Sequence, residues 1–373
     1  MSDVVIVGGG IIGCACAYEL AKRGAKVTLL EYGKTGMQAT NAAAGMLAPM
    51  IEADEPGPML HWGLRALREY PALVAELEQL CGFDVEFRAM GILKAAFGAD
   101  DEARLHRRVA WQRGMGLPIT WLDAPSCREL EPRLSERVTG GLFSETEGAV
   151  SNQLLTLAFE RAAISLGAEI RQRAPLIGFE MTGGRVTAVT TPDGNVACDT
   201  VVLAAGARSG QLAQKLRPRD ALAVPVYPVR GQMIALGGMS TPIQRIVWGP
   251  DGYLVPRANG LVFAGATVED VGFRRRTTKA GVAAMRTMAT ALVPQLSAAK
   301  VHFEWAGLRP GTTDGLPIIG ALPAWPNVIA ATGHYRSGIL LGPITGAAVA
   351  RGIVDGDWSD VPAEFNPARF SST

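Results

Sequence analysis

The chain has 373 residues, and its 36 lysines and arginines nearly balance its 35 aspartates and glutamates, leaving a formal charge of +1. This balance argues against a protein that binds nucleic acid or another polyanion, because such proteins carry an excess of basic residues. Hydrophobic residues make up 48% of the chain, which excludes a disordered polypeptide and allows a large core. At roughly 100–200 residues per domain, the length predicts two domains or one large domain. The 44 glycines follow no G-X-Y period, so local backbone conformations must explain them.

The N-terminal segment has the pattern of a dinucleotide-binding βαβ unit. A β-branched run over residues 4–7 predicts a buried strand, and a G-x-G-x-x-G sequence over 8–13 follows it. Helical sequence then continues to residue 23, and a second apolar strand is predicted over 26–30. Strand, glycines, helix and strand in this order are far more specific than the glycines alone.

Each position of this unit has a mechanical reason. Gly8 allows the tight turn, Gly10 lets a pyrophosphate approach the backbone, and Gly13 lets the helix pack closely on the strand. The helix that begins near Ile11 would present free N–H groups and its positive dipole end to the phosphates. Glu31, 18 residues after Gly13, stands about where an acidic residue accepts hydrogen bonds from the adenosine ribose.

The rest of the chain predicts further helices and strands of both kinds of domain. Helical spacing covers residues 63–80 with a possible break at Pro71, 151–166, 278–292, and 338–354 with an interruption near Pro343. Strands are predicted over 168–170, 185–190 and 200–206. Short β-like runs separated by prolines over 222–267 predict an antiparallel sheet in a second domain. The expected fold class is α/β, a Rossmann-like domain interleaved with an antiparallel-sheet domain.

Metal, hydrolytic and membrane roles find no support in the sequence. The four histidines lack metal-ligand spacing, and no G-x-S-x-G element supports hydrolysis. The five cysteines form no C-x-x-C pair and predict buried thiols in a reducing compartment. The apolar stretch over 4–18 is shorter than the ~20 residues of a membrane helix, so a cytoplasmic protein is expected. The arginine run at 274–276 predicts a solvated face.

Five blocks in the sequence carry a family resemblance. The βαβ unit, A-T-N-A-A-A-G-M-L at 39–47 and G-Y-L-V-P-R at 252–257 resemble the D-amino-acid-oxidase-type FAD-dependent oxidoreductases. W-A-G-L-R-P-G-T-T-D-G-L-P at 305–317 and G-H-Y-R-S-G-I-L-L at 333–341 are similar to the glycine oxidases of the thiamine pathway within that family. The resemblance implies an FAD-binding domain over 1–86, 148–221 and 306–373, and a substrate domain over 87–147 and 222–305.

The resemblance implies that FAD is bound by three separate stretches of the chain. The βαβ unit would hold the nucleotide, residues 39–47 would run under the ring and phosphates, and residues 334–340 would begin a helix near the flavin carbonyl. Some relatives tether FAD through a cysteine at the position of Gly307, so noncovalent FAD is expected here. The implied cofactor-binding residues are Gly8, Gly10, Ile11, Ile12, Gly13, Glu31, Tyr32, Ala39, Thr40, Ala44, Gly45, Met46, Leu47, Leu176, Gly206, His334, Tyr335, Arg336, Ser337, Gly338, Ile339 and Leu340.

The implied substrate ligands are two arginines and two neighbours. Arg309 would hold a substrate carboxylate through its bidentate fork, Tyr253 would donate a further hydrogen bond, and Arg336 would lie near the entrance. Val268 stands where glycine oxidases may carry a methionine, so the pocket shape is expected to differ and glycine need not be the preferred substrate.

The implied activity is oxidation of glycine, or of a small N-substituted glycine or amino acid such as sarcosine, by hydride transfer from the neutral amine to flavin N5. No side-chain base is expected, and O₂ would reoxidise the flavin to give an imine, then a glyoxylate-type product, and H₂O₂. Small amino acid and O₂ are the expected partners, without nucleic acid or membrane, in a homo-oligomer that is a tetramer by resemblance. Three alternatives stay open: a dehydrogenase of this fold that reduces a quinone, a flavoenzyme that processes carboxymethylamino groups on tRNA, and a non-catalytic dinucleotide-binding sensor.

Overall fold

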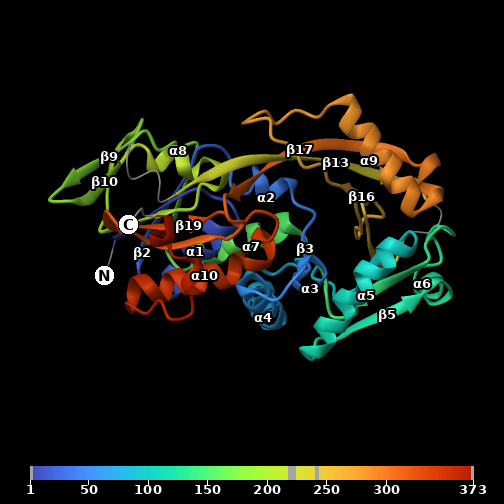
Figure 1. The fold of residues 1–373 in the computed structure, drawn as a ribbon. Coiled ribbons are helices and arrows are strands. Elements are labelled where there is room, and N and C mark those ends of the chain that lie inside the picture. Colours follow the sequence, from blue (N-terminus) through green and yellow to red (C-terminus); the bar gives the residue numbers. More distant parts are fainter. Residues whose placement is uncertain (1–2, 217–223, 240–242, 371–373) are drawn as a thin grey trace.

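Two large β-sheets organise the chain, and they lie side by side in the computed structural model, which describes residues 3–216, 224–239 and 243–370 (Figure 1). The long strands β13 (Val226–Gly237) and β17 (Lys300–Thr312) run along the top of the view, from the first sheet towards the second. The predicted α/β class, with a Rossmann-like part and an antiparallel part, is confirmed.

Parallel pairing dominates the first sheet, as the buried β-branched run at 4–7 predicts. β1 pairs in parallel with β2 and β12, β12 with β19, and β2 with β8, while β18 closes one edge as an antiparallel strand. Within the described residues its strands are, in spatial order, β18 (Ile318–Leu322), β19 (Trp325–Thr332), β12 (Thr200–Leu203), β1 (Asp3–Val7), β2 (Lys26–Glu31) and β8 (Glu169–Gln172).

Both faces of this sheet are covered, which explains its uniformly apolar central strands. One core lies between the sheet and the helices α1 (Ile11–Lys22), α4 (Pro58–Cys81), α7 (Asn152–Ser165) and α10 (Gly338–Val354). On the other face a second core lies beneath β9 (Gly178–Thr182), β10 (Arg185–Thr191), β11 (Gly194–Ala197) and α8 (Ser209–Ala213). The result is a three-layer arrangement, visible on the left of Figure 1.

The second sheet is mainly antiparallel, although β14 and β4 pair in parallel. Among the described residues its order is β17, β13, β16 (Val262–Gly265), β15 (Gly252–Pro256), β14 (Ile246–Gly249), β4 (Ile92–Ala96), β6 (Gly140–Ser144) and β5 (Ile119–Asp123). Neighbouring residues alternate between its faces: Ile234 joins the core with α9 (Lys279–Leu292) and α6 (Ala124–Leu130), and Met233 joins the core with α3 (Pro49–Glu52) and α5 (Ala99–Gly114). The shorter elements are α2 (Ala39–Ala42), β3 (Met46–Leu47), β7 (Gly148–Ala149), η1 (Gly206–Arg208), η3 (Pro294–Ala298), η4 (Ala363–Phe365) and η5 (Pro367–Phe370).

Most of the predicted elements are confirmed, and the two proline interruptions are wrong. α4 runs through Pro71 and begins five residues earlier than predicted, because its Tyr70 and Leu77 are fully buried and packing outweighs one lost hydrogen bond. α10 runs through Pro343, which has no N–H to donate to the carbonyl of Ile339. The Tyr70 hydroxyl donates to that carbonyl instead, so the oxygen keeps a partner.

The structure adds elements that the sequence did not indicate, chiefly the strands and helices between residues 92 and 144. Only Leu105 and Val109 among the apolar side chains of α5 are buried, so its charged sequence gave no clear apolar stripe. Strands of the second sheet come from residues 92–144 and 226–312, and β17 crosses the expected division at 305. The domain division stays a prediction, and its boundary at 221, like Leu222, lies outside the described residues.

None of the helices in the described part of the chain is both long and apolar enough to cross a membrane.

Ser151 offers a direct test of the local rules. Its hydroxyl accepts a hydrogen bond from the backbone N–H of Leu154 at 3.4 Å and caps α7. We expect Ser151→Ala to lower the free energy of unfolding by about 1 kcal/mol, measured by chemical or thermal denaturation. Ser165→Ala, in the exposed last turn of the same helix, is the matched control and should leave stability unchanged. Equal effects of the two substitutions would contradict the capping role.

Candidate active site

Two adjoining cavities meet between the sheets. The first, of about 460 Å³, lies where β1, β2, β12 and β19 end, and the second, of about 350 Å³, lies against β13, β15 and β17. Tyr335, Arg336 and Ile339 line both cavities, so the two spaces share a wall. Ligands of open parallel sheets bind at the carboxyl ends of the strands, which is the position of the first cavity.

The glycines of the first turn have the steric roles that the motif predicts. Gly8 has a φ of 111°, and a Cβ there would lie 2.5 Å from the carbonyl oxygen of Ala204. A Cβ at Gly13 would lie 1.8 Å from the carbonyl oxygen of Gly8, so only glycine lets α1 begin this close to β1. Gly8 and Gly10 line the first cavity, whereas Gly13 lies outside its lining, beneath the turn.

The carboxylate of Glu31 is fixed at the end of β2. One oxygen accepts from the backbone N–H of Gly9 and the other from that of Gly33, both at 2.8 Å. The side chain is buried and lines the first cavity. The adenosine ribose hydroxyls of a dinucleotide would therefore meet an oriented acceptor, which fits the predicted role.

The second predicted stretch folds back over the first. Thr40 on α2 accepts a hydrogen bond from the N–H of Ile11 at 3.0 Å, so it satisfies one of the free donors at the start of α1. Gly45 has a φ of 78°, and a Cβ there would lie 2.1 Å from the carbonyl oxygen of Val150. This stretch therefore passes from the first cavity, lined by Thr40, to the second, lined by Gly45.

The third predicted stretch leads into α10. The ring of His334 is buried, lies 3.0 Å from the hydroxyl of Thr345, and burial lowers its pKa to about 3, so the imidazole is neutral near pH 7. No side chain caps the start of α10 at Gly338. Its positive dipole end and free N–H groups therefore face the shared wall of the cavities, where they could stabilise negative charge on a bound ring.

Eighteen of the predicted cofactor residues line one cavity or both, and four do not. Leu47 and Leu340 belong to the apolar core, and Gly13 and Ser337 lie outside both linings. The lining residues are Gly8, Gly10, Ile11, Ile12, Glu31, Tyr32, Ala39, Thr40, Ala44, Gly45, Met46, Leu176, Gly206, His334, Tyr335, Arg336, Gly338 and Ile339. No cysteine occurs among the described residues that line the two spaces, which fits noncovalent FAD.

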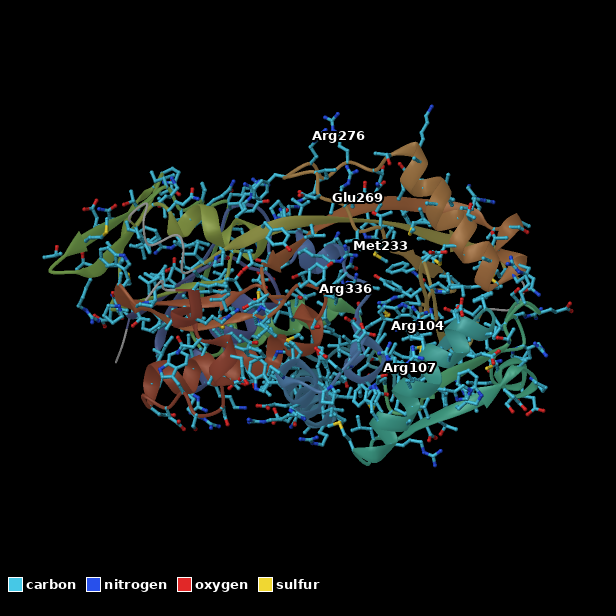
Figure 2. All side chains as sticks on the ribbon, in the orientation of Figure 1. Arg104, Arg107, Met233, Glu269, Arg276 and Arg336 are labelled. Carbon is cyan, nitrogen blue, oxygen red and sulfur yellow. The ribbon has the colours of Figure 1, made fainter. Side chains whose placement is uncertain are left out.

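The sequence analysis did not predict three further residues that line the first cavity, Arg208, Phe273 and Arg275. The guanidinium of Arg208 lies 5.8 Å from the ring of Tyr32 and 4.8 Å from the ring of Phe273. Arg275 belongs to the arginine run that was predicted to be a solvated face. It also lines the first cavity and donates a hydrogen bond to Gln38. Arg276 points away from the molecule in Figure 2, as expected of a solvated side chain.

The second cavity holds the predicted carboxylate ligand, Arg309. Its guanidinium donates to the carbonyl oxygen of Thr267 at 3.1 Å and lies over Gly231, where a Cβ would come within 2.4 Å of it. Among residues 3–216, 224–239 and 243–370 it forms no ion pair within 4.0 Å. A half-buried guanidinium held by a backbone carbonyl keeps donors available for an anionic ligand.

Tyr253 and Val268 line the same cavity at different depths. Burial raises the pKa of the Tyr253 hydroxyl, while the nearby Arg309 guanidinium opposes the rise, so the hydroxyl stays a hydrogen-bond donor. The Tyr253 ring packs at 5.2 Å from that of Trp248, which also lines the cavity. Val268 is 54% exposed, at the rim of the space.

Arg336 lies in the middle of the molecule in Figure 2, on the wall shared by the two cavities. Its guanidinium is exposed, lies 5.2 Å from the ring of Tyr335, and has no ion pair within 4.0 Å in the described chain. The structure therefore brings all four predicted substrate residues into one cavity.

Comparison with known proteins agrees with this geometry. Residues 3–351 match the family model described as FAD dependent oxidoreductase. The chain is 36% identical to glycine oxidase of Geobacillus kaustophilus over 351 residues, 93% of this chain and 92% of that protein. It is 38% identical to the bifunctional protein ThiO/ThiG of Synechocystis sp. over 378 residues, but spans only 54% of that protein's length. The crystal structure of the Geobacillus kaustophilus glycine oxidase superposes with a TM-score of 0.93, 34% identity and 99% coverage of both chains.

Glu31 tests the first cavity. In Glu31→Gln one acceptor oxygen becomes an amide nitrogen, which cannot accept from Gly9 or Gly33. We expect the affinity for FAD to fall at least tenfold, or about 1.4 kcal/mol, measured as flavin retained per chain after gel filtration and by titration of the apoprotein. Glu180→Gln, on an exposed position of β9, is the control and should retain FAD fully. Undiminished FAD affinity in Glu31→Gln would contradict the assignment.

Proposed function

The chain belongs to the family of FAD-dependent oxidoreductases, and we propose that it oxidises glycine or a small N-substituted glycine. FAD is the cofactor, and the first cavity with its three contributing stretches is the site we assign to it. The observation that carries the substrate proposal is the Arg309 guanidinium, free of any ion pair in the described chain, in a cavity that shares a wall with the flavin site. The names of the similar glycine oxidases support the same substrate class.

The protein's contribution to the reaction is mainly positioning. Arg309 binds the substrate carboxylate with Tyr253 as a second donor, which directs the Cα–H towards the shared wall of the cavities. Bound FAD supplies the two-electron acceptor for that hydride. The neutral imidazole of His334 and the start of α10 lie at the same wall, where the helix dipole would stabilise negative charge on a bound, reduced ring.

The overall reaction balances with water and O₂. The amino acid loses a hydride from Cα and a proton from nitrogen to become an imine, and water converts the imine to a 2-oxo acid and ammonia or an amine. O₂ takes up the two electrons and two protons as H₂O₂. Val268 is exposed at the rim and leaves this end of the cavity open, which supports N-substituted glycines as substrates beside glycine.

A peroxide assay of the purified flavoprotein tests the proposal. We expect H₂O₂ to form stoichiometrically with glycine, sarcosine or another N-alkylglycine, and more slowly with larger D-amino acids, because the small cavity and its carboxylate ligand select short substrates. A parallel assay with a quinone-like dye under nitrogen measures the alternative acceptor. Flavin that no amino acid reduces would overturn the proposed function, and reduction without peroxide would assign a dehydrogenase.

The seat of Arg309 provides a graded test. Arg309→Ala removes a charge-assisted bidentate contact, and we expect the KM for the amino acid to rise about 100-fold. Gly231→Ala keeps the charge but displaces the guanidinium, since the new Cβ would lie 2.4 Å from it, so a rise of about 10-fold is expected. Gly114→Ala, where a Cβ meets open space, is the control and should leave KM unchanged. An unaltered KM in Arg309→Ala would show that another group binds the carboxylate.

Two expectations stay predictions: a homotetramer, from the resemblance, and a place in the cytoplasm, from the sequence. Size-exclusion chromatography with light scattering measures the first, and fractionation of the source cells the second.

A further inference from the structure

The lining of the substrate cavity also contains the acidic side chain of Glu52, which the sequence did not single out. Glu52 ends the four-residue helix α3 and belongs to the lining that contains Arg309, Tyr253 and Arg336. Its carboxylate has neither a hydrogen bond nor an ion pair within 4.0 Å among the residues that the structure describes. A carboxylate without a protein partner inside a cavity is costly, so it is retained only where it serves a purpose.

The backbone that carries Glu52 is fixed from one side by another buried carboxylate. Glu147 accepts hydrogen bonds from the N–H groups of Met50 and Ile51, the two residues before Glu52. Burial raises the pKa of Glu147 to about 8, because these few donors only partly offset the loss of water. The start of α3 therefore cannot move without breaking a buried polar contact.

The other side of α3 is fixed through its carbonyl groups. Arg108 donates to the carbonyl oxygen of Ile51 at 2.8 Å and also to that of Ala53, and Gln112 donates to that of Met50 at 2.8 Å. Lys94 donates to Ile51 at 3.2 Å, and burial lowers its pKa to about 8. Side chains from β4, α5 and the segment before β7 thus converge on the backbone of Met50, Ile51 and Ala53.

We explain the number of buried polar side chains bonded to α3 by the side chain that α3 places in the cavity. Burying charged groups is expensive, and an ordinary loop of this length could be held by apolar contacts alone. A site that must place one charge accurately needs a rigid support behind it. The supported charge is Glu52.

We propose that Glu52 binds the amino group of the substrate, opposite the carboxylate bound by Arg309. This assignment rests on the proposed function, since it concerns the same cavity and the same amino acid. A zwitterionic amino acid carries one charge of each sign, and the cavity offers Arg309 for the carboxylate and the partly buried Glu52 for the amino group. The other acidic residue of the lining, Asp251, is exposed. The positive charge of Arg336 at the shared wall partly offsets the cost of burying the Glu52 carboxylate.

The assignment makes Glu52 a selector between amines and amine-free acids. Burial raises the pKa of Glu52, and an ammonium group beside it would favour the charged form and offset that cost. A hydroxy acid offers the carboxylate no positive charge, so its binding leaves Glu52 uncompensated. The carboxylate at position 52 therefore disfavours glycolate while it favours glycine.

The test compares two ligands on the holoenzyme of Glu52→Gln. Glycine is followed by its KM in the peroxide assay and by its Kd from the concentration dependence of flavin reduction in stopped flow under nitrogen. Glycolate is followed by a titration of the flavin absorbance. We expect the glycine constants to rise 10- to 100-fold, while the Kd of glycolate stays the same or falls. Glu52→Asp, which keeps the charge, should recover part of the glycine affinity. Glu55→Gln, an exposed neighbour outside the cavity, should change neither ligand.

The opposite results are equally distinct. Equal weakening of both ligands in Glu52→Gln would show that the carboxylate only supports Arg336 or α3, and unchanged constants for both would show that it binds no amine. If the wild-type enzyme binds glycine but its flavin is not reduced, the proposed oxidation is wrong. Binding of glycine and glycolate then still tests the role of Glu52. Should Glu52→Gln not fold, as judged by circular dichroism, the two constants are measured in Glu52→Ala, which also removes the carboxylate.

Discussion

A pair of glycines that face each other on β13 and β17 is the constraint on which the active site depends. Residues directly opposite in an antiparallel pair point to the same face of the sheet, so Gly231 and Gly307 together leave a gap in the layer of side chains. Ala42 of α2 enters this gap over Gly307, and the Arg309 guanidinium lies over Gly231. The indole N–H of Trp305, two residues before Gly307, donates to the carbonyl oxygen of Ala42 at 3.2 Å. The gap above Gly231 and Gly307 therefore fixes residues 39–47, which are assigned to the flavin, and Arg309 relative to each other.

The direction of the parallel strands supplies the second half of the site. β1, β2, β12 and β19 end at one edge, so segments that are far apart in the sequence meet there. A helix begins soon after two of these strands, α1 after β1 and α10 after β19, and both N-termini face the first cavity. FAD carries negative charge on its pyrophosphate and gains it on its reduced ring. This topology provides positive potential at both places from the backbone alone.

The sequence predicted what depends on local rules and on known motifs. The βαβ unit, the helices α7 and α9, and the cavity positions of Arg309 and Tyr253 follow from glycines, helical spacing and characteristic blocks. Pro71 and Pro343 led to wrong predictions of helix breaks. The hydrogen bond that each proline loses is a local cost visible in the sequence, whereas the packing that offsets it comes from other parts of the fold. Glu52 could not be found at all: its role depends on packing by residues 42 to 95 positions further along the chain, which no spacing reveals.

The charges in the substrate cavity are arranged differently from those on the surface. Several surface charges pair with one another, as Arg88 does with Asp84 at 2.6 Å. In the cavity, the Arg309 guanidinium donates to a backbone carbonyl and packs over Gly231. Glu52 is carried by α3, whose backbone N–H and carbonyl groups are hydrogen-bonded by buried side chains. Opposite charges on flexible supports would collapse into an ion pair and close the space between them. Fixing each charge on its own support keeps them apart, and on the proposed assignment the substrate completes the pairing of both.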